Sequence, residues 1–179
     1  AQQEADTLFK PNVGAPAFKT GSGPIVLIDE GHFNFHTMNG RYLAFSRLLK
    51  SDGYVVEPQT GRFTRAGLDR AAILVVSNAL AERNEEEWAL PTPSAFDSAE
   101  IAIVRDWVKD GGSLWLIADH MPFPGAAGAL ASEFGIAIRN GFALDAGETT
   151  GWMRFTRMDG SLADHPVTGG RNTSERVDS

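Results

Sequence analysis

Residues 23–36 read Gly-Pro-Ile-Val-Leu-Ile-Asp-Glu-Gly-His-Phe-Asn-Phe-His, and this stretch decides the fold. It begins as a continuous apolar run, which is typical of a strand buried on both faces of a parallel sheet. The run then changes abruptly to carboxylates, a glycine and two imidazoles, which marks the carboxyl end of a strand. Ligands of open α/β sheets bind in the crevice outside these strand ends. The first candidate site residues are therefore Asp29, Glu30, His32, Asn34 and His36.

Two further apolar runs end in the same way. They cover residues 71–76, followed by Ser77 and Asn78, and residues 113–118, followed by Asp119 and His120. Because the carboxyl ends of parallel strands meet at one edge of a sheet, we expect these side chains to approach those of the first stretch. Trp115 lies inside the last apolar run, so we expect it to be a core residue.

Helical patterns separate the predicted strands. Helices are predicted over residues 41–50, 97–110 and 126–134, a short helical connection over 64–70, and short strands at 54–57 and 136–138. Asn39 is expected to cap the first helix, while Asp97 and Glu100 have the spacing of a capping box. This alternation predicts an α/β fold with an open, mostly parallel, doubly wound sheet in three layers and right-handed crossovers.

The length of 179 residues fits one domain. Residues 1–23 are rich in Pro and Gly and predict an extended arm, although a disordered leader fits them equally well. Residues 24–179 are predicted to form a single α/β domain. The sequence pattern predicts no helix or strand after residue 170, so we expect this domain to be a fragment of a longer chain. We expect a downstream segment, or a second copy in a homodimer, to cover an outer strand of the sheet.

Composition excludes several classes of function. The net charge of −7 disfavours binding to nucleic acid, and no apolar run is long enough for membrane insertion, so we expect a small-molecule substrate. The chain has no cysteine, which excludes disulfides and thiolate chemistry. The polar start Ala-Gln-Gln-Glu-Ala-Asp resembles the product of signal-peptidase cleavage and predicts a periplasmic or secreted protein.

Three motifs carry a family resemblance. They are Val-Leu-Ile-Asp-Glu-Gly-His at 26–32 with Asn-Phe-His at 34–36, Gly-Gly-Ser-Leu at 111–114 leading to Ala-Asp-His at 118–120, and Asp-His-Pro-Val-Thr at 164–168. Together they resemble a group of exported bacterial proteins of unassigned function with a class I glutamine-amidotransferase-like fold, which is flavodoxin-like in arrangement; the last two motifs also resemble the trehalose-utilisation branch. Amidotransferases use a cysteine on a sharp strand-to-helix turn, so the resemblance does not imply their reaction here.

Histidines beside carboxylates suggest two kinds of chemistry. A divalent metal such as zinc would be held by His32, His36, Asp119 and His120, and would activate a bound water. Without a metal, a histidine oriented by a carboxylate would act as general base, with Ser77 the best-placed hydroxyl. The candidate catalytic residues are Asp29, Glu30, His32, Asp119 and His120. The segment Asp29-Glu30-Gly31-His32 fits a hydrogen-bonded structural cluster equally well.

The candidate substrate-binding residues are Asn34, Ser77, Asn78 and Trp88. Trp88 lies in the long loop over residues 79–96, which fits either a binding loop or a solvated excursion. The first functional hypothesis is a hydrolase acting on a small ester, phosphoester or glycan-derived substrate. The alternative is a non-catalytic ligand-binding or envelope-assembly domain, in which the same polar residues only build the loops.

Overall fold

The structure is a computed structural model that describes residues 4–142, 147 and 153–179. The chain divides into two compact units, residues 1–142 and residues 143–179, and each is described by itself. The first unit contains the sheet. The prediction of a single domain over residues 24–179 stays a prediction.

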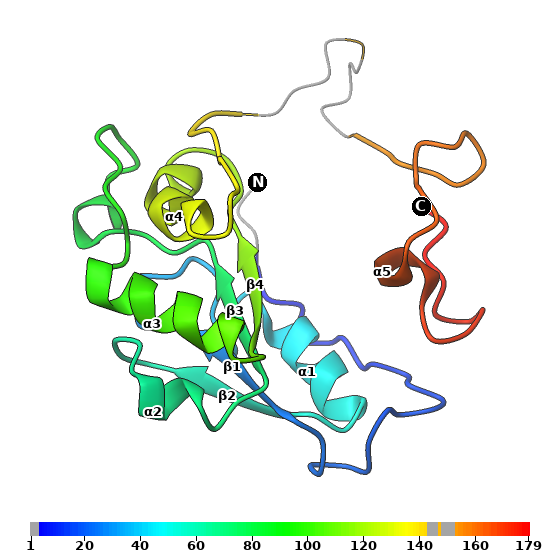
Figure 1. Cartoon of the computed structure of the whole chain (residues 1–179). Helices are drawn as coiled ribbons and strands as arrows, with labels where there is room; N and C mark the ends of the chain where they lie inside the picture. Colours follow the sequence, from blue (N-terminus) through cyan, green and yellow to red (C-terminus); the bar gives the residue numbers. More distant parts are fainter. Residues whose placement is uncertain (1–3, 143–146, 148–152) are drawn as a thin grey trace. The chain divides into compact units, whose positions relative to one another are not determined.

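Four parallel strands form one open sheet, which confirms the α/β class. They are β1 (Ile25–Asp29), β2 (Val55–Gln59), β3 (Ile73–Ser77) and β4 (Ser113–Ile117), in the order β2-β1-β3-β4 (Figure 1). In register, Leu27 lies beside Leu74 and Leu74 lies beside Leu114. The order reverses between β1 and β3, so the crevice that open α/β sheets use for ligands lies at the carboxyl ends of these two strands.

Within the described residues, the structure contains five α-helices and a short 3-10 helix besides the strands. They are α1 (Leu43–Ser51), α2 (Arg65–Leu68), η1 (Glu82–Asn84), α3 (Ser98–Lys109), α4 (Phe123–Ser132) and, in the second unit, α5 (Pro166–Gly169). The predicted capping box of α3 is confirmed, because the Asp97 carboxylate accepts from Glu100 N at 2.9 Å and Glu100 accepts from Asp97 N at 3.3 Å. The Glu100 side chain is thereby held at the first turn of α3.

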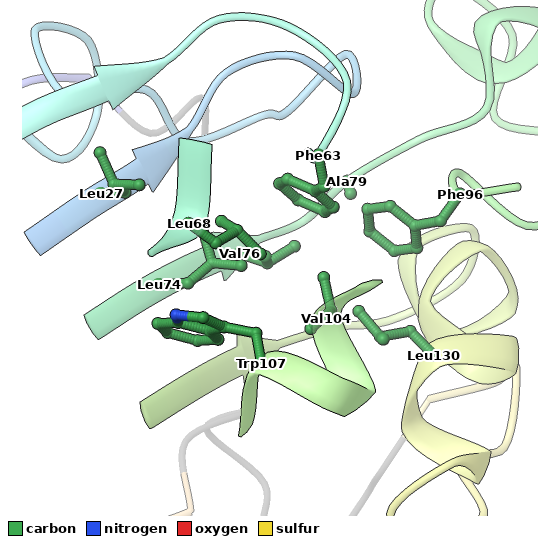
Figure 2. Close-up of a cluster of buried hydrophobic side chains, with 10 residues drawn as sticks. All are labelled: Leu27, Phe63, Leu68, Leu74, Val76, Ala79, Phe96, Val104, Trp107 and Leu130. Carbon is green, nitrogen blue, oxygen red and sulfur yellow. The ribbon is translucent and has the colours of Figure 1, made fainter. Parts of the chain in front are cut away.

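Two hydrophobic clusters use alternate residues of the strands. Leu27, Leu74 and Val76 join the first cluster, which includes Val104 and Trp107 of α3 (Figure 2). Val26, Ile28 and Val75 join the second, against which Phe45 and Leu49 of α1 pack. Successive side chains of a strand point to opposite faces of a sheet, so helices pack on both faces of β1 and β3. This explains why both strands read as continuous apolar runs.

Three details of the first unit differ from the sequence predictions. Trp115 is 53% exposed rather than buried, because β4 is an edge strand and has no neighbour on one side. Residues 136–138 form no strand, and Ile136 is exposed. Helix α1 begins after a series of turns with Tyr42 at its N-cap position, so Asn39 does not cap it. The predicted cover for an outer strand stays a prediction.

Residues 4–23 have neither helix nor strand, and they contact α1 and the turn between α1 and β2. Arg47 of α1 donates to the carbonyl oxygens of Thr7 and Phe9 at 2.7 and 3.1 Å. The ring of Phe18 lies edge-on to that of Tyr54, with 5.1 Å between centroids. Within the described residues, every helix is too short or too polar to cross a membrane.

The second unit is organised around Arg157. Its guanidinium donates to the carbonyl oxygens of Val177 and Thr168 at 2.8 and 2.9 Å, and pairs with Asp164. His165 caps α5 by accepting from Val167 N at 3.1 Å. The Asp-His-Pro segment thus forms a turn that caps α5. The sequence pattern at 149–155 predicts a strand or an ordered loop, and this segment lies partly outside the described residues.

Candidate functional site

The loops that follow β1 and β3 are bonded to each other at the carboxyl edge of the sheet. Phe35 N donates to Asn78 O at 3.0 Å, and Leu80 N donates to His32 O at 2.8 Å. The Asn78 amide oxygen accepts from Asp119 N at 3.0 Å, which ties the end of β3 to the end of β4. Asn78 has φ +48°, a left-handed conformation that Asn tolerates, so the chain turns sharply after Ser77. The three predicted strand ends therefore meet.

His32 lies between two carboxylates. Its Nδ1 contacts both oxygens of Asp29 at 2.9 and 3.0 Å, and its Nε2 contacts Glu100 Oε1 at 3.0 Å. Phe63 and Phe96 flank the ring, at 4.5 and 4.7 Å between centroids. Ionised carboxylates only accept hydrogen bonds, so the ring satisfies both of them by donating from both nitrogens as an imidazolium.

The charge of His32 follows from these neighbours. Burial alone lowers the pKa of the ring, but the hydrogen bonds and charges of Asp29, and then of Glu100, outweigh burial and raise the pKa above its ordinary value. With both ring nitrogens bonded, His32 has no lone pair for a metal ion or for a substrate proton. Its visible role is to join the end of β1 to the first turn of α3.

Asn34 completes the cluster around Asp29. Its Nδ2 donates to Asp29 Oδ2 at 2.9 Å, and its Oδ1 accepts from His32 N at 3.0 Å. Glu100 is the member that sequence reasoning missed as a site residue, because its capping-box spacing indicates only a helix start. Its Oε1 also accepts from Phe63 N at 2.9 Å.

His36 lies apart from this cluster, with Ser77 and Tyr42. Its Nδ1 contacts Ser77 Oγ at 3.0 Å, its ring stacks on Tyr42 at 4.6 Å, and Ser77 Oγ donates to Tyr42 Oη at 2.9 Å. Burial, and then the charge of Arg41, lower the pKa of His36 below its ordinary value, and Asp119 only partly offsets them. Ser77 is 0% exposed, which does not suit a nucleophile that must meet a substrate.

Two cavities open beside the loop over residues 30–36. The first, of about 510 Å³, is lined by Glu30, Gly31, Phe33, Asn34, Phe35, Arg41, Thr60, Leu80, Glu85 and Trp88. The second, of about 380 Å³, is lined by Gly31, His32, Phe33, Arg62, Leu80, Ala81, Glu82, Ser94, Ala95, Phe96, Asp97 and Glu100. Glu30, Asn34 and Trp88 thus lie in a cavity wall, and the loop over 79–96 contributes to both cavities.

His120 differs from the other two histidines in its hydrogen bonding. Its Nδ1 contacts the Met121 carbonyl oxygen at 2.7 Å, and a carbonyl only accepts, so Nδ1 carries the proton. In the neutral ring, Nε2 then carries the lone pair. The ring lies 6.0 Å from that of Trp88 and stacks on Phe142 at 4.8 Å. Asp119 is exposed and contacts Asn78 through its backbone rather than orienting the imidazole.

The predicted metal ligands occupy three separate environments. His32 lies with Asp29 and Glu100, and His120 lies beside Trp88. His36 contacts Ser77, and the charge of Asp119 acts on it. Across residues 4–142, 147 and 153–179, no three His, Asp or Glu side chains are grouped to hold a metal ion. A zinc ion on the predicted ligands stays a prediction, and it requires His32 to exchange a carboxylate for the metal.

The candidate site therefore has three parts. They are the hydrogen-bonded cluster of Asp29, His32 and Glu100, the cavity lined by Glu30 and Trp88, and His120, whose Nε2 can accept a proton. Comparison of the chain with protein-family models, with characterised proteins and with solved structures gives no match.

Proposed function

We propose that the protein is a hydrolase that binds a small substrate in the 510 Å³ cavity and activates water with His120. The observation that carries this proposal is the tautomer of His120, because a ring whose Nδ1–H is held by a backbone carbonyl presents Nε2 as a proton acceptor. Trp88 links this group to the cavity, since it lines the cavity wall and lies beside the imidazole.

In this mechanism Nε2 of His120 takes a proton from a water molecule as the water attacks the substrate. The proton then passes to the leaving group, so the ring acts in turn as base and acid. Glu30 lies in the cavity wall, where one of its carboxylate oxygens accepts from Met38 N at 2.6 Å. Asp29 acts only as a positioning group, since His32 and Asn34 occupy its oxygens.

A substrate panel with a histidine variant tests the proposal. We expect hydrolysis of at least one of p-nitrophenyl acetate, p-nitrophenyl phosphate and p-nitrophenyl N-acetylglucosaminide. Removing a general base lowers kcat by about 10²–10⁴-fold, so His120→Ala should show that loss on the active substrate. His165→Ala is the matched control, because His165 also uses Nδ1 locally but caps α5 in the second unit.

Two results would contradict the proposal. One is absence of turnover on all three substrates, and the other is turnover that His120→Ala leaves unchanged. Repeating the assay with EDTA separates the two predicted sources of activated water, because a chelator abolishes metal-assisted hydrolysis and leaves histidine-assisted hydrolysis intact.

The second candidate is a non-catalytic ligand-binding or envelope-assembly domain. The hydrogen bonding of His32 favours this alternative, because both of its ring nitrogens are bonded to carboxylates. The cluster of Asp29, His32 and Glu100 therefore joins β1 to α3 and offers no free nitrogen for catalysis. Under this alternative, a ligand binds the cavity without turnover, and His120→Ala leaves its affinity unchanged. Calorimetry of ligand binding beside the substrate assay distinguishes the two functions.

We further propose that the fold is the three-layered, doubly wound, class I glutamine-amidotransferase-like one and that the protein is exported. The strand order β2-β1-β3-β4 and the packing of helices on both faces of β1 and β3 support the fold. The sequence contains no cysteine, so the amidotransferase reaction is not proposed. Fractionation of the native cells tests export.

A further inference from the structure

Phe33 stands between the two cavities at the site. The walls of the cavities share three residues, Gly31, Phe33 and Leu80, and Phe33 is the one aromatic residue common to both linings. Its side chain is 41% exposed. In the part of the chain that the structure describes, none of the aromatic pairs includes the Phe33 ring, whereas Phe35 and Trp88 pack against other rings. The ring is therefore open to a ligand.

The backbone of Phe33 is strained and is fixed from both sides. It has φ +48°, which a bulky aromatic residue rarely adopts. The chain before it is held because His32 N donates to Asn34 Oδ1 and His32 O accepts from Leu80 N. Strain of this kind persists where surrounding structure enforces it and gathers at ligand-binding positions.

The charges around the cavities restrict the ligand. Five carboxylates line them, those of Glu30, Glu82, Glu85, Asp97 and Glu100, with Arg41, Arg62 and His32 as the cationic groups. Each cation already has a partner: Arg41 lies over the Phe35 ring, Arg62 pairs with Asp97 and Glu100, and His32 bonds two carboxylates. An anionic ligand such as a phosphoester would meet net negative charge, so the walls favour a neutral one rich in hydroxyl groups.

We propose that the two cavities are subsites of one binding site for a neutral oligosaccharide of at least two sugar units, with Phe33 as the aromatic platform between them. The apolar face of a sugar ring stacks on an exposed aromatic ring, and carboxylates accept hydrogen bonds from its hydroxyl groups. This inference rests on the proposed function, because it takes the first cavity as the substrate site, and it selects the glycan-derived class among the substrates proposed.

Calorimetry with matched sugars tests the two-subsite arrangement. The probes are N,N′-diacetylchitobiose, cellobiose and maltose, each compared with its monosaccharide. If both cavities are used, at least one disaccharide should bind about tenfold or more tightly than its monosaccharide, which is the size of one good stacking contact. Phe33→Ala should reduce the ratio of disaccharide affinity to monosaccharide affinity to about one. Phe33→Tyr keeps the aromatic ring, so this ratio should stay near that of the unmodified protein.

Two controls keep the test independent of folding and of catalysis. Trp115→Ala removes an exposed aromatic ring of β4 that lines neither cavity, and it should leave the ratio unchanged. Thermal unfolding of Phe33→Gly, which relieves the positive φ while removing the ring, separates loss of binding from loss of structure. All the variants retain His120, so sugar binding is measured apart from turnover.

The outcomes separate this inference from the proposed function. Absence of binding to all three disaccharides, or a ratio that Phe33→Ala leaves unchanged, overturns the inference even if the protein hydrolyses one of the nitrophenyl substrates. A Phe33-dependent ratio with no hydrolysis of any substrate supports the inference and overturns the hydrolase.

Discussion

His32 and His120 both follow a strand end, yet they differ in what their ring nitrogens contact. His32 bonds Asp29 and Glu100 with its two nitrogens, whereas His120 bonds one backbone carbonyl and keeps Nε2. His32 is 4% exposed, and His120 is only partly buried beside Trp88. The comparison teaches that a position after a strand end does not by itself give a histidine a role in catalysis. A ring nitrogen without a hydrogen-bond partner is also needed.

The largest expected effect is the stability loss of His32→Ala. Removing the imidazolium leaves Asp29 and Glu100 buried without their shared positive partner, and breaking a buried ion pair costs about 3–5 kcal/mol. His120→Ala should cost about 0.5 kcal/mol or less, typical of a substitution outside the core. Urea unfolding of both variants measures the difference. Equal losses would show that His32 is not the structural histidine.

The second expected effect is an opposite response of His32 and His36 to pH. The raised pKa of His32 means that its contribution to stability is fully present below the unfolded-state pKa and is lost as pH rises through the folded-state pKa. The lowered pKa of His36 has the reverse sign, since the unfolded chain takes up that proton first and stability falls as the solution is acidified.

Nitrogen NMR of the imidazole rings checks this directly. At a pH near the ordinary value of histidine, we expect His32 to be charged at both nitrogens and His36 to be neutral. The variants His32→Gln and His36→Gln assign the signals. A neutral His32 under these conditions would mean that one of its two carboxylates carries the proton instead, and the ion-pair account of the cluster would fail.

The smallest expected effect is that of Asn34→Ala. It removes the bonds to Asp29 Oδ2 and to His32 N but leaves the imidazolium in place, so we expect a loss of about 1–2 kcal/mol. Asn39→Ala is the matched control on an exposed turn and should change stability by about 0.5 kcal/mol or less. If the two variants lose the same free energy of unfolding, Asn34 does not support the cluster.

Much of the first unit could be predicted from local patterns. The runs that became β1 and β3 are apolar because helices pack on both of their faces. The capping box of α3 depends on residues three apart. The predictions of a strand at 136–138 and of an Asn39 cap were wrong. A short apolar run forms a strand only beside another strand, and an Asn caps a helix only where the helix begins next to it.

By itself, the sequence determined the alternation of strands and helices, the polar residues at the strand ends and the absence of thiol chemistry, because these depend on residues close in the chain. Only the tertiary structure decided which polar groups meet. Glu100 reaches His32 from 68 residues away, His36 pairs with Ser77 instead of with His32, and Trp115 is exposed because β4 is an edge. Hydrogen-bond partners and burial are set by long-range packing, which no local pattern encodes.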